Sequence, residues 1–292
     1  LDSAVYYHQG RGICRGEMPE RRDTIQGPPI SGPVIKVVVP RLPRISNFDD
    51  LDPLEAEPDV ELCFIELSEP LPADADVVVL PGSKATIGDL QALRRAGWDI
   101  DLKAHVRRGG WVVGLCGGFQ MLGSSVDDPE GIEGLCADEP GLGLLPITTT
   151  LSGGKTLVER TGTHIATGCA VSGYEMHIGV TTMPDETLAM LRLGDHDHGV
   201  RSEDGRVMGC YLHGLFSSDE FRHAFLNGVS TRSDRGVRYE AGIEATLDAF
   251  AAHLEAHVDI DRLLEVARRH APQPTSPVTS SADSPVSQQA LT

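Results

Sequence analysis

The sequence predicts an α/β fold, in which a mostly parallel twisted sheet carries helices on both faces and continues into an antiparallel extension. Two observations predict it. Over residues 34–122, apolar strand-like runs alternate with segments of helical periodicity, the order that right-handed crossovers connect in a parallel sheet. Further along, short strand-like runs follow one another without intervening helices, which is typical of antiparallel hairpins; they cover 142–151, 168–181, 187–193 and 206–212.

The parallel part begins with β-branched runs that lack polar alternation, the pattern of strands buried on both faces. Two helices are predicted between these strands. Ile87, Leu90 and Leu93 recur at helical spacing in the first, and the pair Gly109 and Gly110 ends the second. The predicted strands are 34–39, 61–65, 76–80 and 111–115, and the predicted helices are 86–96 and 99–108.

Two more helices are predicted near the C-terminus, at 218–228 and 240–269. An apolar stripe on the longer one is formed by Leu247, Phe250, Leu254 and Val258. Residues 1–33 show no sustained periodicity and are expected to be a linker or remnant, and residues 34–270 form the predicted domain. The Pro-, Ser- and Thr-rich residues 271–292 are expected to be a disordered tail.

The charge and cysteine content exclude several classes of protein. With 43 Asp+Glu against 25 Lys+Arg the formal net charge is −18, so neither nucleic acid nor an anionic membrane surface is an expected partner. No apolar run approaches the roughly 18–20 residues that span a bilayer, and no signal-peptide pattern opens the chain. The six cysteines are not spaced like a secreted disulfide framework. A cytoplasmic enzyme is therefore expected.

The most informative motif is GLCGG at residues 114–118, between a predicted strand and a predicted helix. Such a turn presents Cys116 at the carboxyl end of the strand, with glycines where a Cβ would clash. The helix N-terminus favours the reactive thiolate, and the Gly117 N–H is directed at an oxyanion on the bound substrate. The alternative is a buried structural cysteine beside a glycine-rich turn. The motif makes Cys116 the candidate nucleophile.

A cysteine nucleophile needs a base, and two histidines are candidates. His213 ends a short apolar strand and precedes glycine, so its imidazole can take the thiol proton and return it to a leaving amine. His177 is the rival; strand alternation places it on one face with Glu175, which also suits contact with substrate or a partner. Gly82, at the end of another strand, is a candidate second oxyanion donor. Taken singly, each of these also fits an ordinary loop or turn residue.

Two other motifs are not assigned to sites. Residues 153–156 (GGKT) match the end of a phosphate-binding loop, but Thr149 stands where that motif needs its first glycine. Residues 195–198 (DHDH) carry metal-ligand side chains, yet adjacent residues of a turn point in different directions. We therefore expect a solvated hairpin tip there and no metal site.

With Cys116 and His213, four stretches give the chain a resemblance to the C-terminal glutamine amidotransferase domain of the cobyric acid synthase family, a class I, triad-type amidotransferase. In order, they cover about residues 34–225. They are VPRLPRISNF at 39–48, LPGSKAT at 80–86, GLCGGFQMLG at 114–123, and the pair GYEMHIG at 173–179 with YLHGLF at 211–216.

The resemblance implies glutamine hydrolysis. Cys116 is then the nucleophile that attacks the side-chain amide, His213 the general base and acid, and Gly82 and Gly117 the oxyanion donors. Water clears the resulting glutamyl thioester, and the ammonia goes to an ATP-dependent synthetase that amidates corrinoid carboxylates in cobalamin biosynthesis. The chain is thus expected to bind glutamine and no cofactor, with ATP, Mg and the corrinoid on the synthetase partner.

Two departures from the family pattern affect these expectations. Class I amidotransferases generally place a Glu two residues after the histidine, where this chain has Leu215. The cobyric acid synthase branch is similar in lacking that Glu, so a Cys–His dyad is implied, and the group that orients His213 is unassigned, with Glu175 as a candidate. The family's N-terminal synthetase domain is not found, so we expect either a fragment or a subunit that works with a separate synthetase chain.

Two other interpretations stay open at the level of sequence. One is a stand-alone amidotransferase subunit of a Mur-ligase-like synthetase, whose branch has a similar Cys-Gly-Gly turn. The arginine-rich residues 41–48 and the YLHGLF motif favour the corrinoid branch instead. The other is a catalytically silent α/β binding module, against which the intact Cys116 and His213 argue.

Overall fold

The computed structural model describes residues 33–134, 137–232 and 236–270. Their contacts divide the chain into two compact units, with the boundary between Glu240 and Ala241. The linker expected before residue 33 and the tail expected from residue 271 lie outside the described residues. None of the described helices combines the length and apolar composition that a membrane crossing requires.

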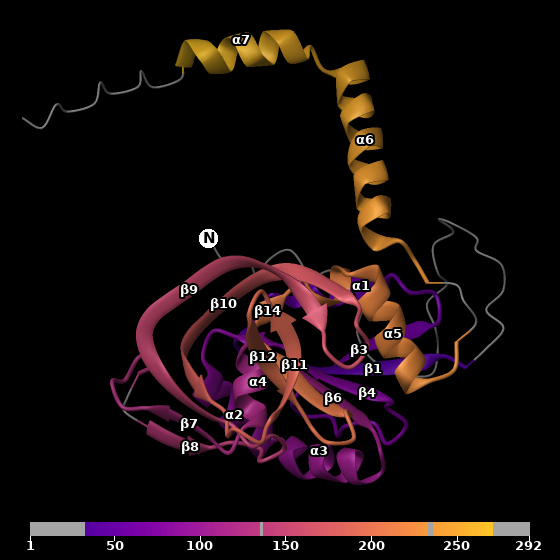
Figure 1. Ribbon diagram of the computed structural model, residues 1–292. Helices are drawn as coiled ribbons and strands as arrows, with labels where there is room; N and C mark the ends of the chain where they lie inside the picture. Colours follow the sequence, from indigo (N-terminus) through magenta and orange to yellow (C-terminus); the bar gives the residue numbers. More distant parts are fainter. Residues whose placement is uncertain (1–32, 135–136, 233–235, 271–292) are drawn as a thin grey trace, which may run out of the picture. The chain divides into compact units, whose positions relative to one another are not determined.

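Five parallel strands form one half of a continuous sheet in the first unit (Figure 1). Their β-branched side chains are buried on both faces, as the apolar runs predict. In spatial order they are β3 (Val60–Ile65), β1 (Ile35–Pro40), β4 (Val77–Leu80), β6 (Trp111–Leu115) and β13 (Val207–Cys210). The four predicted parallel strands are therefore confirmed, within a residue or two at their ends. The run at 206–212, expected among the antiparallel hairpins, instead adds β13 to the parallel half, because it pairs in parallel with β6.

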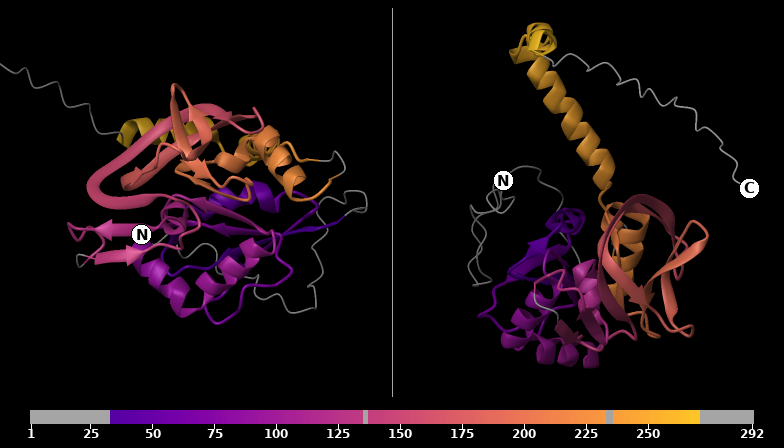
Figure 2. Two further views of the ribbon diagram at one scale, coloured as in Figure 1. Left: turned by 60° about the horizontal axis from the view of Figure 1, so that its bottom comes forward. Right: turned by 90° about the vertical axis from the view of Figure 1, so that its left-hand side faces the viewer.

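The other half of the sheet is antiparallel and begins at the edge of β13. Its two longest strands curve into an arch that is visible in Figures 1 and 2. From β13 outward the strands are β12 (His196–Arg201), β11 (Leu188–Leu193), β9 (Thr148–His164), β10 (Ala170–Thr182) and β14 (Leu212–His213). Two short strands, β7 (Ser125–Asp128) and β8 (Ala137–Pro140), pair at the side of β9, and β2 (Ile45–Ser46) pairs with β5 (Gly82–Ser83) separately.

Helices cover both faces of the parallel half, as predicted. Along β1, Val38 packs into one core layer while Val37 and Val39 pack into the other, because successive side chains of a strand point to opposite faces. The first layer is completed by α2 (Thr86–Arg95), α3 (Trp98–Arg107) and α4 (Gly117–Leu122). The second is completed by η2 (Phe48–Leu51), α1 (Asp52–Glu55), η3 (Leu215–Ser217) and α5 (Asp219–Val229).

The second unit contains most of α6 (Tyr239–His257), followed by α7 (Ile260–His270). The single helix expected over 240–269 is therefore wrong: the chain leaves the helical path at Val258 and Asp259. The side chain of Asp259 accepts a hydrogen bond from the Arg262 N–H at 2.9 Å, which caps a new helix.

Two expectations for the antiparallel half need correction. The strand expected from residue 142 starts only at Thr148, because the N–H groups of Leu142 and Leu144 bond to carbonyls at the end of α4 instead. The DHDH segment forms a hairpin turn as expected, but His198 is not solvated, being 7 % exposed within β12. Burial lowers the pKa of His198 to about 4, so its neutral Nε2 accepts the Tyr211 N–H at 3.1 Å. The GGKT segment lies inside β9 rather than in a loop.

Candidate active site

Cys116 stands in a strained backbone conformation between β6 and α4. It has φ 52° and ψ −109°, a region that residues with a side chain rarely adopt. The neighbouring glycines make this turn sterically feasible. A Cβ on Gly118 would lie 2.0 Å from the Leu80 carbonyl oxygen, and one on Gly114 would lie 2.7 Å from the Gly118 oxygen. The GLCGG motif therefore forms the sharp strand-to-helix turn that the sequence predicts, with Cys116 at its apex.

His213 lies on β14, which pairs with β10 at the edge of the arch. Its Nδ1 donates to Asp50 Oδ2 at 2.7 Å, and the Gly214 N–H donates to Asp50 Oδ1 at 2.7 Å. Both side chains are buried, with 1 % of His213 and 5 % of Asp50 exposed. His213 Nε2 has no hydrogen-bond partner among the described residues, so one ring nitrogen is oriented by a carboxylate while the other is available for chemistry.

The charge state of His213 follows from its neighbours. Burial lowers the pKa of His213, but the hydrogen bond to Asp50 and the interactions with the Cys116 side chain outweigh burial and raise the pKa to about 10. The imidazole is therefore protonated at neutral pH, while the Cys116 Sγ donates to the Met176 carbonyl at 3.2 Å. An imidazolium beside a cysteine is the arrangement that activates thiolate nucleophiles.

Tyr174 covers one face of the His213 imidazole. Its ring stacks on that of His213 with centroids 5.1 Å apart, and its hydroxyl accepts a hydrogen bond from Asn47 Nδ2 at 2.8 Å. Asn47 precedes η2, the same turn that carries Asp50, so one short segment holds both the tyrosine and the histidine.

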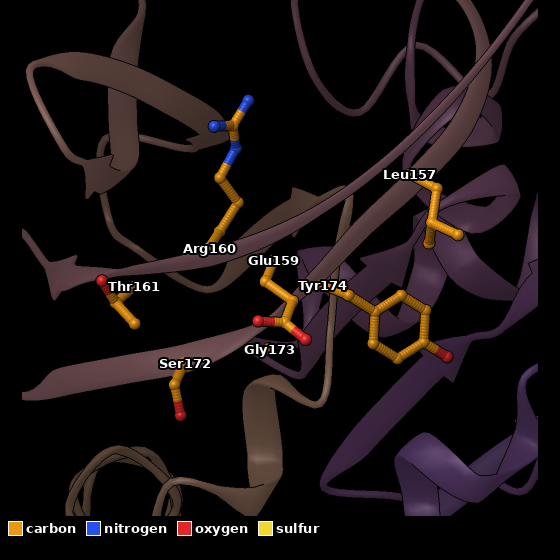
Figure 3. Close-up of a pocket in the computed structure, with 7 residues that line it drawn as sticks. All are labelled: Leu157, Glu159, Arg160, Thr161, Ser172, Gly173 and Tyr174. Carbon is orange, nitrogen blue, oxygen red and sulfur yellow. The ribbon is translucent and has the colours of Figure 1, made fainter. Parts of the chain in front are cut away.

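Tyr174 also lines an open hollow of about 770 Å³ on the arch formed by β9 and β10. Figure 3 shows Leu157 and Tyr174 at one end of this hollow and Thr161 and Ser172 at the other. Tyr174 belongs to both places, because it lines the hollow and stacks on His213. The hollow therefore adjoins the candidate site.

The two predicted oxyanion donors lie together. A Cβ on Gly117 would be 2.9 Å from the Ser83 nitrogen, and one on Gly82 would be 3.7 Å from Cε1 of His213. The β2–β5 register pairs Gly82 with Ser46, and the Lys84 N–H donates to the Arg44 carbonyl at 2.9 Å. Hydrogen-bonded and non-hydrogen-bonded residue pairs alternate along an antiparallel ladder. Since Lys84 is hydrogen-bonded to Arg44, the pair two positions away is hydrogen-bonded too, and the Gly82 N–H is directed toward Ser46. Gly82 is thus beside the imidazole as predicted, but its N–H faces β2 and is not presented to an oxyanion on Cys116 in this structure.

Glu175 and His177 share one face of β10, as the alternation predicts, but neither contacts His213 by hydrogen bond or ion pair among the described residues. Glu175 accepts from Arg160 Nε at 3.1 Å and lies 3.5 Å from His177 Nδ1. The His177 ring stacks on Tyr211 at 3.9 Å, and burial lowers its pKa, with Glu175 only partly offsetting this. The contact considered for Glu175, orienting the histidine, is made by Asp50 instead.

Sequence reasoning missed Asp50. It lies 163 positions before His213 and within a short acidic run, so no local spacing marks it. The available signal was positional: the run follows β1, whose carboxyl end lies at the same sheet edge as that of β6. Among the described residues, no group of three or more His, Cys, Asp or Glu could hold a metal ion.

A parallel α/β sheet with a strained cysteine at the carboxyl end of a central strand, and a carboxylate-bound histidine beside it, defines a cysteine-dependent α/β amidotransferase type of domain. Residues 36–221 match the model of the CobB/CobQ-like glutamine amidotransferase domain, and the chain belongs to this family.

Curated relatives agree with this assignment. Cobyric acid synthase of Rhodobacter capsulatus is 52 % identical over 246 residues, which are 84 % of this chain and 50 % of that protein. Cobyric acid synthase of Ruegeria sp. is 53 % identical over 236 residues, 81 % of this chain and 48 % of that protein. The chain thus spans about half the length of the curated relatives it matches. The resemblance drawn from the motifs is confirmed.

A solved structure supports the fold. The structure of PurLQS from Thermotoga maritima is similar with a TM-score of 0.52 at 18 % identity, covering 68 % of this chain and all of that one. The predicted fold class is confirmed by this likeness and by the sheet order described above.

Proposed function

We propose that this chain hydrolyses glutamine through a thioester on Cys116 and supplies the ammonia to an ATP-dependent synthetase that amidates corrinoid carboxylates. The observation that carries the proposal is the pairing of the strained Cys116 with an imidazole whose other nitrogen is bound to Asp50. The names of the relatives support the corrinoid branch over a Mur-ligase-like partner.

In the proposed reaction His213 is protonated and Cys116 reacts as the thiolate. Cys116 Sγ attacks the side-chain amide carbon of glutamine, and the carbonyl oxygen becomes an oxyanion beside the Gly117 N–H at the start of α4. The tetrahedral intermediate collapses when His213 gives its proton to the amide nitrogen, the C–N bond breaks, and ammonia leaves a glutamyl thioester.

The second half regenerates the enzyme. Neutral His213 takes a proton from water as the water oxygen attacks the thioester carbon. The C–S bond then breaks, glutamate leaves, and the sulfur returns as thiolate beside the protonated imidazole. Asp50 keeps the proton on Nδ1 throughout and stabilises the imidazolium in each resting state.

Carboxylate activation is assigned to the partner. Nucleotide and Mg are proposed to bind the synthetase, because the GGKT segment lies within β9 and forms no phosphate-binding loop. The corrinoid is likewise proposed to bind there.

Ammonia release from glutamine and the intact mass of the protein after rapid acid quench test the hydrolysis. The parent chain should release ammonia and show the mass of a glutamyl adduct. Cys116→Ala should show neither and should resist alkylation by a glutamine-like chloroketone. Ammonia release by Cys116→Ala at the parent rate would exclude Cys116 as nucleophile.

The partner is tested separately. A cobyric acid synthase whose own amidotransferase cysteine is replaced by alanine should amidate a corrinoid with glutamine only when this chain is added. Free ammonium salt serves as the positive control. Ammonia release without any gain in corrinoid amidation would support the hydrolysis and exclude the proposed partner.

A further inference from the structure

A buried ion pair joins the segment that follows Asp50 to the segment that follows His213. Arg222, on α5, donates from Nε to Glu57 Oε1 at 2.7 Å, and both side chains are completely buried. The same guanidinium donates from Nη1 to the Phe216 carbonyl, also at 2.7 Å. One side chain therefore binds both segments.

Every polar group of this pair is engaged. Arg222 Nη2 donates to Asp219 Oδ1 at 2.8 Å and to the Val237 carbonyl at 2.5 Å. Glu57 also accepts from Arg232 Nη2 at 2.6 Å. Burying two charges is costly in free energy, and well-packed apolar residues often stabilise a protein as well or better. Fold stability alone therefore does not explain the pair.

The two segments are those that carry Asp50 and His213, the residues joined by the hydrogen bond at Nδ1. Glu57 follows Asp50 after the short elements η2 and α1. Phe216 lies in η3, which starts directly after Gly214. Both η2 and α1 contact η3. At one end the two segments are joined by the hydrogen bonds of Asp50 to His213 and Gly214. At the other end they are joined by Arg222, which binds both Glu57 and Phe216.

We propose that Arg222 is a positioning residue for the reaction, which holds η3 against the η2–α1 segment so that Asp50 stays within hydrogen-bond distance of His213. This inference rests on the proposed function, which gives that pair its catalytic role. A guanidinium suits the task because its planar fork can bind a carboxylate and a carbonyl at fixed angles, which an ammonium cannot.

Arg232 offers a matched control. It also binds Glu57, and its Nε donates to Asp59 at 2.6 Å. Among the described residues, its hydrogen bonds go to these two carboxylates and none to η3. Replacing Arg232 therefore disturbs the same buried carboxylate but leaves the contact with Phe216 in place.

The experiment measures the pKa of the His213 imidazole by NMR in histidine-labelled protein, together with kcat and KM for glutamine and the melting temperature. The variants are Arg222→Met and Arg232→Met, and His213→Gln assigns the resonance. In Arg222→Met the His213 pKa should fall by about one unit or more, because its bond to Asp50 loosens. Its kcat should fall about tenfold or more with KM changed less than about twofold. Arg232→Met should keep the parent pKa and kcat, whatever its melting temperature.

A second variant separates positioning from stability. Arg222→Met with Glu57→Met removes both buried charges and should melt at a higher temperature than Arg222→Met alone, while the His213 pKa stays lowered. Equal His213 pKa values in the parent and this double variant would overturn the inference. So would equal pKa shifts in Arg222→Met and Arg232→Met. Since the NMR titration needs no turnover, a parent chain that hydrolyses no glutamine would contradict the proposed function separately.

Discussion

Asp50 binds the catalytic segment at two adjacent points: one oxygen accepts His213 Nδ1 and the other accepts the Gly214 N–H, each at 2.7 Å. A carboxylate held in this way sets both the tautomer and the ring orientation of the imidazole. It occupies the role that a Glu two residues after the histidine would have in the class I pattern, where this chain has Leu215. Asp50 is therefore the group that orients His213, which the sequence left unassigned.

Asp50→Asn should lower the rate of glutamine hydrolysis about 100-fold or more. A carboxamide no longer stabilises the imidazolium and can present its NH2 group to Nδ1, which favours the wrong tautomer. Initial rates of ammonia release measure the effect. Asp49→Asn, at the exposed neighbouring position, is the control and should retain the parent rate. Equal rates for the two variants would exclude Asp50 from catalysis.

Hydrolysis should decline at alkaline pH as His213 loses its proton, since the protonated imidazole is needed to release ammonia. The raised pKa of about 10 places this decline near pH 10 in the parent chain. In Asp50→Asn, the decline should move toward the ordinary histidine value of about 6.5. A profile of kcat/KM against pH, recorded for the parent chain and for Asp50→Asn, measures the position of this decline in each. An unmoved alkaline limb in the variant would contradict the role of Asp50.

The same titration affects stability. Because the folded-state pKa of His213 lies above its unfolded value, its contribution to stability is fully present below about pH 6.5 and is lost as pH rises through about 10. The difference in free energy of unfolding between the parent and His213→Gln should therefore shrink across that interval. Denaturant titrations at several pH values check this, and a constant difference would argue against a raised pKa.

His213→Ala should slow thioester formation far more than His177→Ala. His213 is the imidazole oriented by Asp50 and coupled to Cys116, whereas His177 stacks on Tyr211 and its pKa is lowered by burial. Rapid-quench measurement of the glutamyl adduct compares the two variants. A larger loss at His177 would move the general base to that residue.

Gly118→Ala should destabilise the fold by about 2 kcal/mol or more and disturb the cysteine turn, because the new Cβ meets the Leu80 carbonyl oxygen. Alanine normally stabilises a helix relative to glycine, so the sign is reversed here. Gly88→Ala is the matched control, because its new Cβ would lie 3.9 Å from Ala85 Cβ, an ordinary contact. This substitution should raise the free energy of unfolding by about 0.5–1 kcal/mol. Urea unfolding of both variants measures the contrast.

Local patterns along the chain were enough to predict most of the parallel half of the sheet and the sharp turn that carries Cys116. Buried strands and amphipathic helices leave local patterns of apolar residues, and the strained turn at Cys116 needs glycines at fixed neighbouring positions. These requirements involve residues close together in the sequence, so they can be recognised from the sequence alone. The same holds for His213, whose strand end and following glycine appear in one motif.

Which side chains meet in the candidate site became known from the three-dimensional packing alone. Asp50 reaches His213, and Arg222 reaches Glu57, because η2 and α1 of the β1–β3 connection and η3 and α5 of the segment after β14 pack on the same face of the sheet. His198 likewise became a buried acceptor through the pairing of β12 with β13. Such contacts depend on long-range chain packing, which no local pattern in the sequence encodes.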